Sequence, residues 1–141
     1  MKKHLIDAGP LIALFDKDDN YHDSIKSFLE SYNGVLYTSW PVITEVLHML
    51  NFNVNVQIDF LKWIKMGGLD VIQLSQSHIS RIIELSEKYS DIPMDFADAT
   101  LIIISEFKNI DNIISIDSDF YIYRNVRNEY LNNALNINEN Q

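Results

Sequence analysis

Short apolar runs alternate with longer amphipathic segments along this chain, and this alternation is the feature that most restricts its fold. The short runs have the length and composition of buried strands. The segments between them carry apolar residues at helical spacing, as with Ile25, Phe28 and Leu29. Strands that alternate with helices are typical of a parallel sheet covered by helices. We therefore predict an α/β fold whose central, mostly parallel sheet is flanked by helices on both faces. The predicted strands are 3–7, 35–38, 69–74 and 112–116.

Capping residues and helix breakers delimit the predicted helices. Pro10 suits the first turn of a helix that ends near Phe15. Ser39 or Trp40 is expected to cap the helix that Pro41 opens. The other predicted helical ranges are 21–32, 41–50, 54–65, 75–90 and 96–107.

A chain of 141 residues fits one domain, and it contains neither an internal repeat nor a linker. We predict a single domain over residues 1–131, followed by an Asn-rich tail over 132–141 that frays at its end. The longest apolar run, 99–104, is too short to cross a bilayer, so no membrane association is expected. The chain has no cysteine, which excludes disulfides and thiolate metal sites and suits a cytoplasmic protein.

Six acidic residues lie at the edges of apolar runs and not in solvated charge stretches. Burying several carboxylates together is costly unless a cation neutralises them. Oxygen ligands of this kind predict a Mg²⁺ or Mn²⁺ site and a hydrolase that acts on a phosphate ester. Ligands of parallel α/β sheets bind beyond the carboxyl ends of strands, where Asp7 and Asp117 are expected. The six residues are Asp7, Glu45, Asp95, Asp98, Asp117 and Asp119.

Each acid also has a purely structural interpretation. Asp95 is placed to cap a helix, with Asp98 as its partner in a capping box. Asp119 fits an Asx-type turn that begins at Asp117. Asp7 ends a strand before a Gly-Pro turn, which by itself accounts for a polar residue there, and the side chain of Glu45 can extend from its apolar neighbours to water. These interpretations compete with the metal site at each position, but the metal site explains several positions together.

Other polar and aromatic residues give weaker signals. His48 lies one turn after Glu45, so it either lines the same crevice or packs in the core. Tyr121 and Tyr123 either stack on nucleic-acid bases or pack at an edge of the sheet. By their position near loops at the site, the expected phosphate contacts are Lys17, Arg124 and Arg127.

The net charge of −9 and the pI of about 4.7 argue against tight, salt-sensitive binding to a long polyanion. They favour a small, specifically bound RNA segment or a basic protein partner.

Four segments of the chain resemble, in order and spacing, the motifs of the PIN-domain nucleases, most closely the VapC-type toxins of type II toxin–antitoxin pairs. Asp7, Glu45, Asp98 and Asp117 occupy the acidic positions of that pattern, and Asp95 is an extra acid seen in one subgroup. A segment with a histidine, DDNYHDSIKSFLE, also fits the family. The four matching segments are LIDAGPLIALF, TSWPVITEVLHML, MDFADATLIIISE and SIDSDF.

The resemblance implies a PIN-like domain that acts as a Mg²⁺- or Mn²⁺-dependent endoribonuclease on single-stranded RNA, such as a tRNA loop. It assigns the catalytic, metal-binding core to Asp7, Glu45, Asp98 and Asp117. Asp95 and Asp119 would ligate the metal directly, through water, or act only through their charge. The hydroxyl of Ser115 would orient one of the carboxylates.

The resemblance also implies two protein partners. One is an antitoxin whose C-terminal segment enters the active-site groove, and the other is a second copy of the chain in a homodimer. Three other interpretations stay open: a catalytically inactive PIN-like domain that binds a partner, a stand-alone RNA-processing nuclease, and a receiver-like phosphoacceptor domain. The receiver-like interpretation calls for an acidic pair at the end of the first strand, where this chain has a single aspartate, Asp7.

Overall fold

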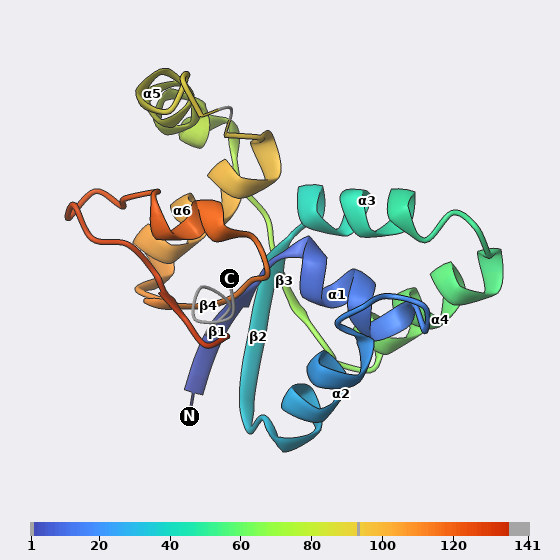
Figure 1. Cartoon of the computed structure of the whole chain (residues 1–141). Coiled ribbons are helices and arrows are strands. Elements are labelled where there is room, and N and C mark those ends of the chain that lie inside the picture. Colours follow the sequence, from blue (N-terminus) through green and yellow to red (C-terminus); the bar gives the residue numbers. More distant parts are fainter. Residues whose placement is uncertain (1, 93, 136–141) are drawn as a thin grey trace.

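The strands of the computed structural model, which describes residues 2–92 and 94–135, form one five-stranded sheet in which every pairing is parallel. The strand order is β3-β2-β1-β4-β5, and Figure 1 shows β1 and β2 at the centre of the molecule. The predicted α/β class and parallel sheet are therefore confirmed. The strands are β1 (Lys2–Ile6), β2 (Gly34–Ser39), β3 (Asp70–Ile72), β4 (Asn112–Ile114) and β5 (Asn132–Asn133).

Helices cover both faces of this sheet, as predicted. In Figure 1, α1, α2 and α4 lie to the right of the strands, and α6 lies to the left. The helix α3 packs against both α1 and α6. None of the described helices has the length and apolarity that a membrane span requires. The helices are α1 (Ala8–Phe15), α2 (His22–Ser31), α3 (Trp40–Met49), α4 (Val54–Lys65), α5 (Ile79–Lys88) and α6 (Phe96–Lys108), with short 3₁₀ helices η1 (Gln76–His78) and η2 (Ser118–Tyr121).

The direction in which the chain adds strands reverses at β1. The chain first builds outward from β1 to β2 and β3, and then returns to place β4 on the other side of β1. The strands β1 and β4 are in register from Leu5 and Ile113 to Ile6 and Ile114. The residues that follow the two strands therefore meet at one edge of the sheet, which is where parallel α/β proteins bind ligands.

The most deeply buried helix is α6, in agreement with its apolar sequence. Every residue from Ala97 to Ser105 is buried, because the helix packs against β2, α3 and α5. Burying one leucine or isoleucine side chain contributes about 1.5–3 kcal/mol, so α6 is a large part of the core. Its burial fixes the position of Asp98, which lies in its first turn.

Local chemistry explains where the helices begin, and the structure corrects one predicted helix. Ser39, and not Trp40, caps α3 by accepting a hydrogen bond from the backbone N–H of Val42. The first helix begins at Ala8 and ends at Phe15, with Pro10 in its first turn, as predicted. Proline is tolerated there because the first N–H groups of a helix have no partner inside the helix. The predicted helix over 75–90 is shorter and divides into η1 and α5.

The sheet extends beyond residue 131, where the sequence placed the domain boundary. Asn132 and Asn133 form β5 beside β4, and the N–H of Ala134 donates to the carbonyl of Ile113 at 2.8 Å. Asparagine is disfavoured in strands, so the sequence carries no signal for this edge strand. The remainder of the predicted tail, residues 136–141, lies outside the described residues.

Candidate active site

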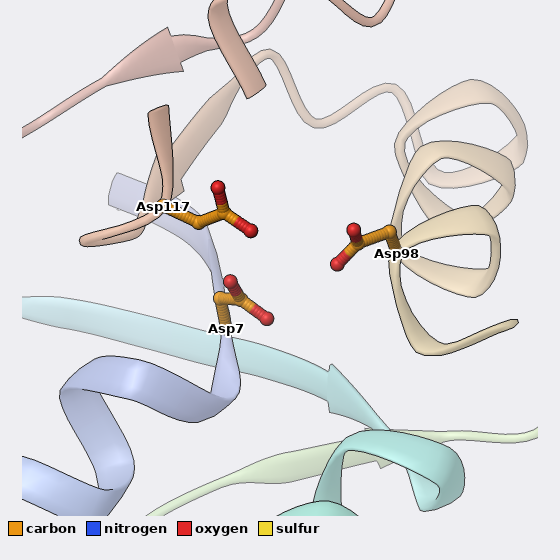
Figure 2. A group of neighbouring side chains, drawn as sticks. All are labelled: Asp7, Asp98 and Asp117. Atoms are coloured by element: carbon orange, nitrogen blue, oxygen red, sulfur yellow. The ribbon is translucent and has the colours of Figure 1, made fainter. Parts of the chain in front are cut away.

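Three aspartates from distant parts of the chain converge at the edge of the sheet where the strand order reverses. Asp7 follows β1, Asp117 follows β4, and Asp98 lies in the first turn of α6. One carboxylate oxygen from each lies within 4.8 Å of the others. Figure 2 shows the three side chains pointing toward one another. We call Asp7, Asp98 and Asp117 the aspartate cluster.

Asp7 is held by two hydrogen bonds and is 6% exposed. Its Oδ1 atom accepts from the backbone N–H of Ala8 at 2.8 Å, so Asp7 caps α1. Its Oδ2 atom accepts from the hydroxyl of Ser115 at 3.1 Å. The contact expected between Ser115 and a carboxylate is thus present. Ser115 is positioned in turn by Asn133 of β5, whose side-chain amide donates to the Ser115 carbonyl at 2.8 Å.

Asp98 is also 6% exposed, and its carboxylate accepts a hydrogen bond from the hydroxyl of Tyr123 at 3.2 Å. The ring of Tyr123 is fully buried and packs edge-on against Tyr89 and Phe120. The hypothesis that Tyr123 stacks on bases is therefore wrong, because no face of its ring reaches solvent. The sequence missed the contact with Asp98, and no spacing between the two residues signals it.

Burial and mutual repulsion raise the pKa values of the clustered carboxyl groups. Burial, followed by the charges of Glu45 and Asp117, raises the pKa of Asp7 to about 7 despite its two hydrogen bonds. Burial and the charges of its acidic neighbours raise the pKa of Asp98 to about 8. At neutral pH the cluster therefore retains protons unless a cation replaces them. Converging hard oxygen donors that repel one another fit a divalent cation such as Mg²⁺ or Mn²⁺.

The other predicted acids lie around the aspartate cluster and not within it. Glu45 and Asp95 line the same pocket as the cluster, which has a volume of about 330 Å³. The Asp95 side chain accepts from the backbone N–H of Asp98 at 2.8 Å, so its interpretation as a helix cap is confirmed. The N–H of Asp119 donates to Asp117 at 2.9 Å, which is the predicted turn. Burial raises the pKa of Glu45, and the charges of Asp95 and Asp117 add to this effect.

The predicted phosphate contacts Lys17, Arg124 and Arg127 do not line the pocket that contains the aspartate cluster. Arg127 forms ion pairs with Glu129 at 3.0 Å and Asp111 at 3.1 Å. Arg124 donates to backbone carbonyls, including that of Tyr121 at 3.0 Å, and Lys17 is exposed after α1. Within 2–92 and 94–135, no lysine or arginine lines the acidic pocket. Phosphate binding by these three residues stays a prediction.

Of the two positions considered for His48, the structure shows the one that lines the crevice. Its side chain is exposed and lines a second pocket, which shares Glu45 and Asp95 with the acidic one. The alternative of a core histidine is wrong, because the face of α3 that packs into the core carries Val42 and Val46 instead.

A parallel sheet with helices on both faces, and carboxylates gathered where its strand order reverses, defines a doubly wound α/β protein with an acidic site. The model of the PIN domain family matches residues 4–126. The chain therefore belongs to the PIN domain family, and the resemblance noted in its sequence is confirmed.

Two relatives from Mycobacterium tuberculosis illustrate this membership. Ribonuclease VapC26 is 22% identical over 115 residues, which are 80% of this chain and 85% of the relative. The crystal structure of VapC20, a sarcin–ricin loop cleaving toxin, superposes with a TM-score of 0.74 at 21% identity. That alignment covers 84% of this chain and 92% of the VapC20 chain, and it shows that the fold is shared over nearly the whole domain.

Proposed function

We propose that this chain is a Mg²⁺- or Mn²⁺-dependent endoribonuclease that cleaves single-stranded RNA, and that it is the toxin of a toxin–antitoxin pair. The observation that carries the proposal is the aspartate cluster at the strand-order reversal of a PIN domain. The names of the two relatives, a ribonuclease and an RNA-cleaving toxin, support it.

In this proposal Asp7, Asp98 and Asp117 would hold the cation, and Glu45, which lines the same pocket, would bind the cation directly or through water. Asp7 and Asp98 are buried and held by hydrogen bonds, whereas Asp117 is exposed and leaves one side open to a substrate. A bound divalent cation supplies positive charge that activates a water and stabilises the leaving oxygen of a phosphodiester. We also propose that Asp95 and Asp119 act on that cation only through their negative charge, because Asp95 caps α6 and Asp119 lies in the turn that begins at Asp117.

The hydrogen bonds to the cluster keep its oxygens aimed into the pocket. Ser115 and Tyr123 each donate to one carboxylate oxygen, and such an oxygen can still bind a cation through its second lone pair. These donors also favour the ionised carboxylates and so work against the rise in pKa caused by burial.

The acidic surface limits the substrates that this nuclease binds. A chain with a net charge of −9 has little general affinity for RNA, so we propose one specific RNA segment, such as a tRNA loop. The same surface suits an antitoxin that carries basic residues into the pocket. A cytoplasmic homodimer of one nuclease domain per chain is the assembly that we propose.

The test compares the wild-type chain with Asp7→Asn and with Asp59→Asn, a matched control that removes one exposed acid from α4. We expect the wild type and the control to arrest growth and to cleave RNA when Mg²⁺ or Mn²⁺ is present. Asp7→Asn should do neither, and a chelator should stop the wild-type reaction. Equal behaviour of all three proteins would refute catalysis by this site and favour a partner-binding domain.

Replacing Tyr123 by phenylalanine should weaken metal binding without unfolding the chain. The change removes only the hydroxyl that donates to Asp98, while the buried ring keeps its packing. Loss of a group that orients a metal ligand typically weakens metal binding by about 10- to 100-fold. Calorimetric titration with Mn²⁺ measures the effect. Tyr121→Phe is the control, because its hydroxyl donates to Leu135 and not to an acid; equal weakening in both variants would contradict the assigned contact.

A further inference from the structure

Two large aromatic side chains are exposed at the first positions of the helices that border the acidic pocket. Trp40 opens α3 and is 53% exposed, and Phe96 opens α6 and is 57% exposed. Exposed apolar side chains that gather at a concave surface mark a binding site more often than scattered ones do. The two rings line a pocket that shares Glu45 and Asp95 with the pocket of the aspartate cluster, so we expect this surface to bind a ligand.

A buried hydrogen bond connects the N-terminal ends of α3 and α6, which carry Trp40 and Phe96. The hydroxyls of Ser39 and Thr100, both fully buried, form a hydrogen bond of 2.7 Å between the start of α3 and the first turns of α6. Ser39 and Asp95 cap the two helices. The rings thus project from rigid elements, and the surface between them exists before a ligand binds.

Trp40 and Phe96 line a pocket of about 630 Å³ together with Pro41 and His48. Glu45 and Asp95 line this pocket and the acidic pocket alike. We call the pocket lined by Trp40 and Phe96 the aromatic pocket. A ligand that extends from the aspartate cluster past Glu45 and Asp95 enters it directly.

The charges around the two pockets select the kind of ligand group that binds there. Among the described residues, neither pocket is lined by a lysine or an arginine. Two of the arginines, Arg81 and Arg127, are already paired with acids. In the part of the chain that the structure describes, these two pockets therefore offer no permanently cationic side chain to an RNA phosphate. A nucleobase is flat and uncharged, so it stacks on an aromatic ring without repulsion from the acids.

We propose that the pocket of Trp40 and Phe96 binds an unstacked nucleobase of the RNA strand whose phosphodiester lies at the aspartate cluster. This inference rests on the proposed ribonuclease function. Stacking against the rings stabilises the bound RNA, which the acidic surface does not attract electrostatically. The ring nitrogens of His48 would hydrogen-bond to the edge of the base. Because a base can stack on these rings only after it leaves its own stack, the pocket favours unpaired nucleotides in single-stranded segments.

Tryptophan fluorescence tests the binding step separately from cleavage. The chain has two tryptophans, Trp40 and Trp63. Trp63 lies on α4 and packs against Phe60 of the same helix and Phe15 of α1. Trp63→Phe therefore leaves Trp40 as the only indole, and adding Asp7→Asn prevents cleavage. We expect oligouridylate to quench this fluorescence and an abasic oligomer of the same length to leave it unchanged. Equal effects of the two oligomers, or no effect of either, would overturn the inference.

Kinetics of RNA cleavage test whether the pocket serves the reaction. Trp40→Ala should raise KM about tenfold or more while kcat changes little, and Trp40→Phe should retain most of the affinity. Phe52→Ala is the control, since Phe52 is 59% exposed on the turn after α3 and should leave KM unchanged. Normal cleavage with an unchanged KM in Trp40→Ala overturns the inference and leaves the proposed function intact.

Two further outcomes are decisive. If the wild type cleaves no RNA, the proposed function fails, and the fluorescence titration alone decides whether a base binds at Trp40. If Trp40→Ala changes the sedimentation of the protein without RNA, a second copy occupies the pocket, and the inference is overturned.

Discussion

Replacing Asp98 by asparagine is expected to raise the melting temperature of the metal-free protein while abolishing RNA cleavage. The carboxyl group of Asp98 is 6% exposed, and burial together with acidic neighbours raises its pKa to about 8. Near pH 8 its ionisation therefore opposes folding by several kcal/mol. Asparagine has nearly the same shape, carries no charge and can still accept the hydrogen bond from Tyr123.

Thermal unfolding in the presence of a chelator measures the first effect, and we expect a rise of about 5–10 °C near pH 8. Cleavage should fall by more than about 100-fold, because even residues that only orient a metal ligand contribute roughly 10- to 100-fold. Asp59→Asn makes the same change in net charge at an exposed site on α4 and should alter neither quantity. A lower melting temperature for Asp98→Asn would show that its carboxylate stabilises the metal-free fold and would refute the electrostatic account of the cluster.

The second large effect concerns pH: the metal-free protein should lose stability as the pH rises through neutrality. The pKa of Asp7 rises from 3.8 to about 7 on folding, and that of Asp98 from 3.8 to about 8. Between the unfolded and folded values the native state binds protons that the unfolded chain has released. Stability must then fall with increasing pH. The contribution is fully present below pH 3.8 and is lost once the pH exceeds about 8.

Urea unfolding at acidic, neutral and alkaline pH, with a chelator present, measures this dependence. Mg²⁺ or Mn²⁺ replaces the protons at the cluster, so added metal should restore stability most at alkaline pH. A metal at 100 times its dissociation constant stabilises the native state by about 2.7 kcal/mol. The double variant Asp7→Asn/Asp98→Asn is the control and should show a much flatter dependence. A stability that increases with pH, or an unchanged slope in the double variant, would contradict this account.

Local signals in the sequence predicted most of the fold. The helix over 54–65 has the predicted bounds, because an asparagine caps its start and two glycines follow its end. The parallel sheet and its helical layers follow from the alternation of apolar runs. The edge strand β5 was missed, because its two asparagines are held by hydrogen bonds to β4 and its surroundings and have no strand propensity of their own.

The candidate site, like the fold, was predicted where local sequence patterns mark a residue and not where its position depends on packing. The sequence placed Asp7 and Asp117 after strands and Asp95 at a helix start, since strand ends and caps leave local patterns. Through its resemblance to a family, the sequence grouped Asp7, Glu45, Asp98 and Asp117. The structure gathers three of these acids in the aspartate cluster and places Glu45 in the lining of the same pocket. The distances between these acids depend on strand order and helix packing, which no local sequence pattern predicts.

The sequence by itself determined the types of residue available: carboxylates at the ends of apolar segments, an acidic surface, and no cysteine. Only the tertiary structure decided that carboxylate oxygens of three of the six acids lie within 4.8 Å of one another, that Tyr123 supports Asp98, and that Trp40 and Phe96 line a common pocket. The physical reason is that burial and repulsion act through space. A carboxylate acquires a raised pKa, and an aromatic ring a neighbour, only when packing brings together segments that are distant in the chain.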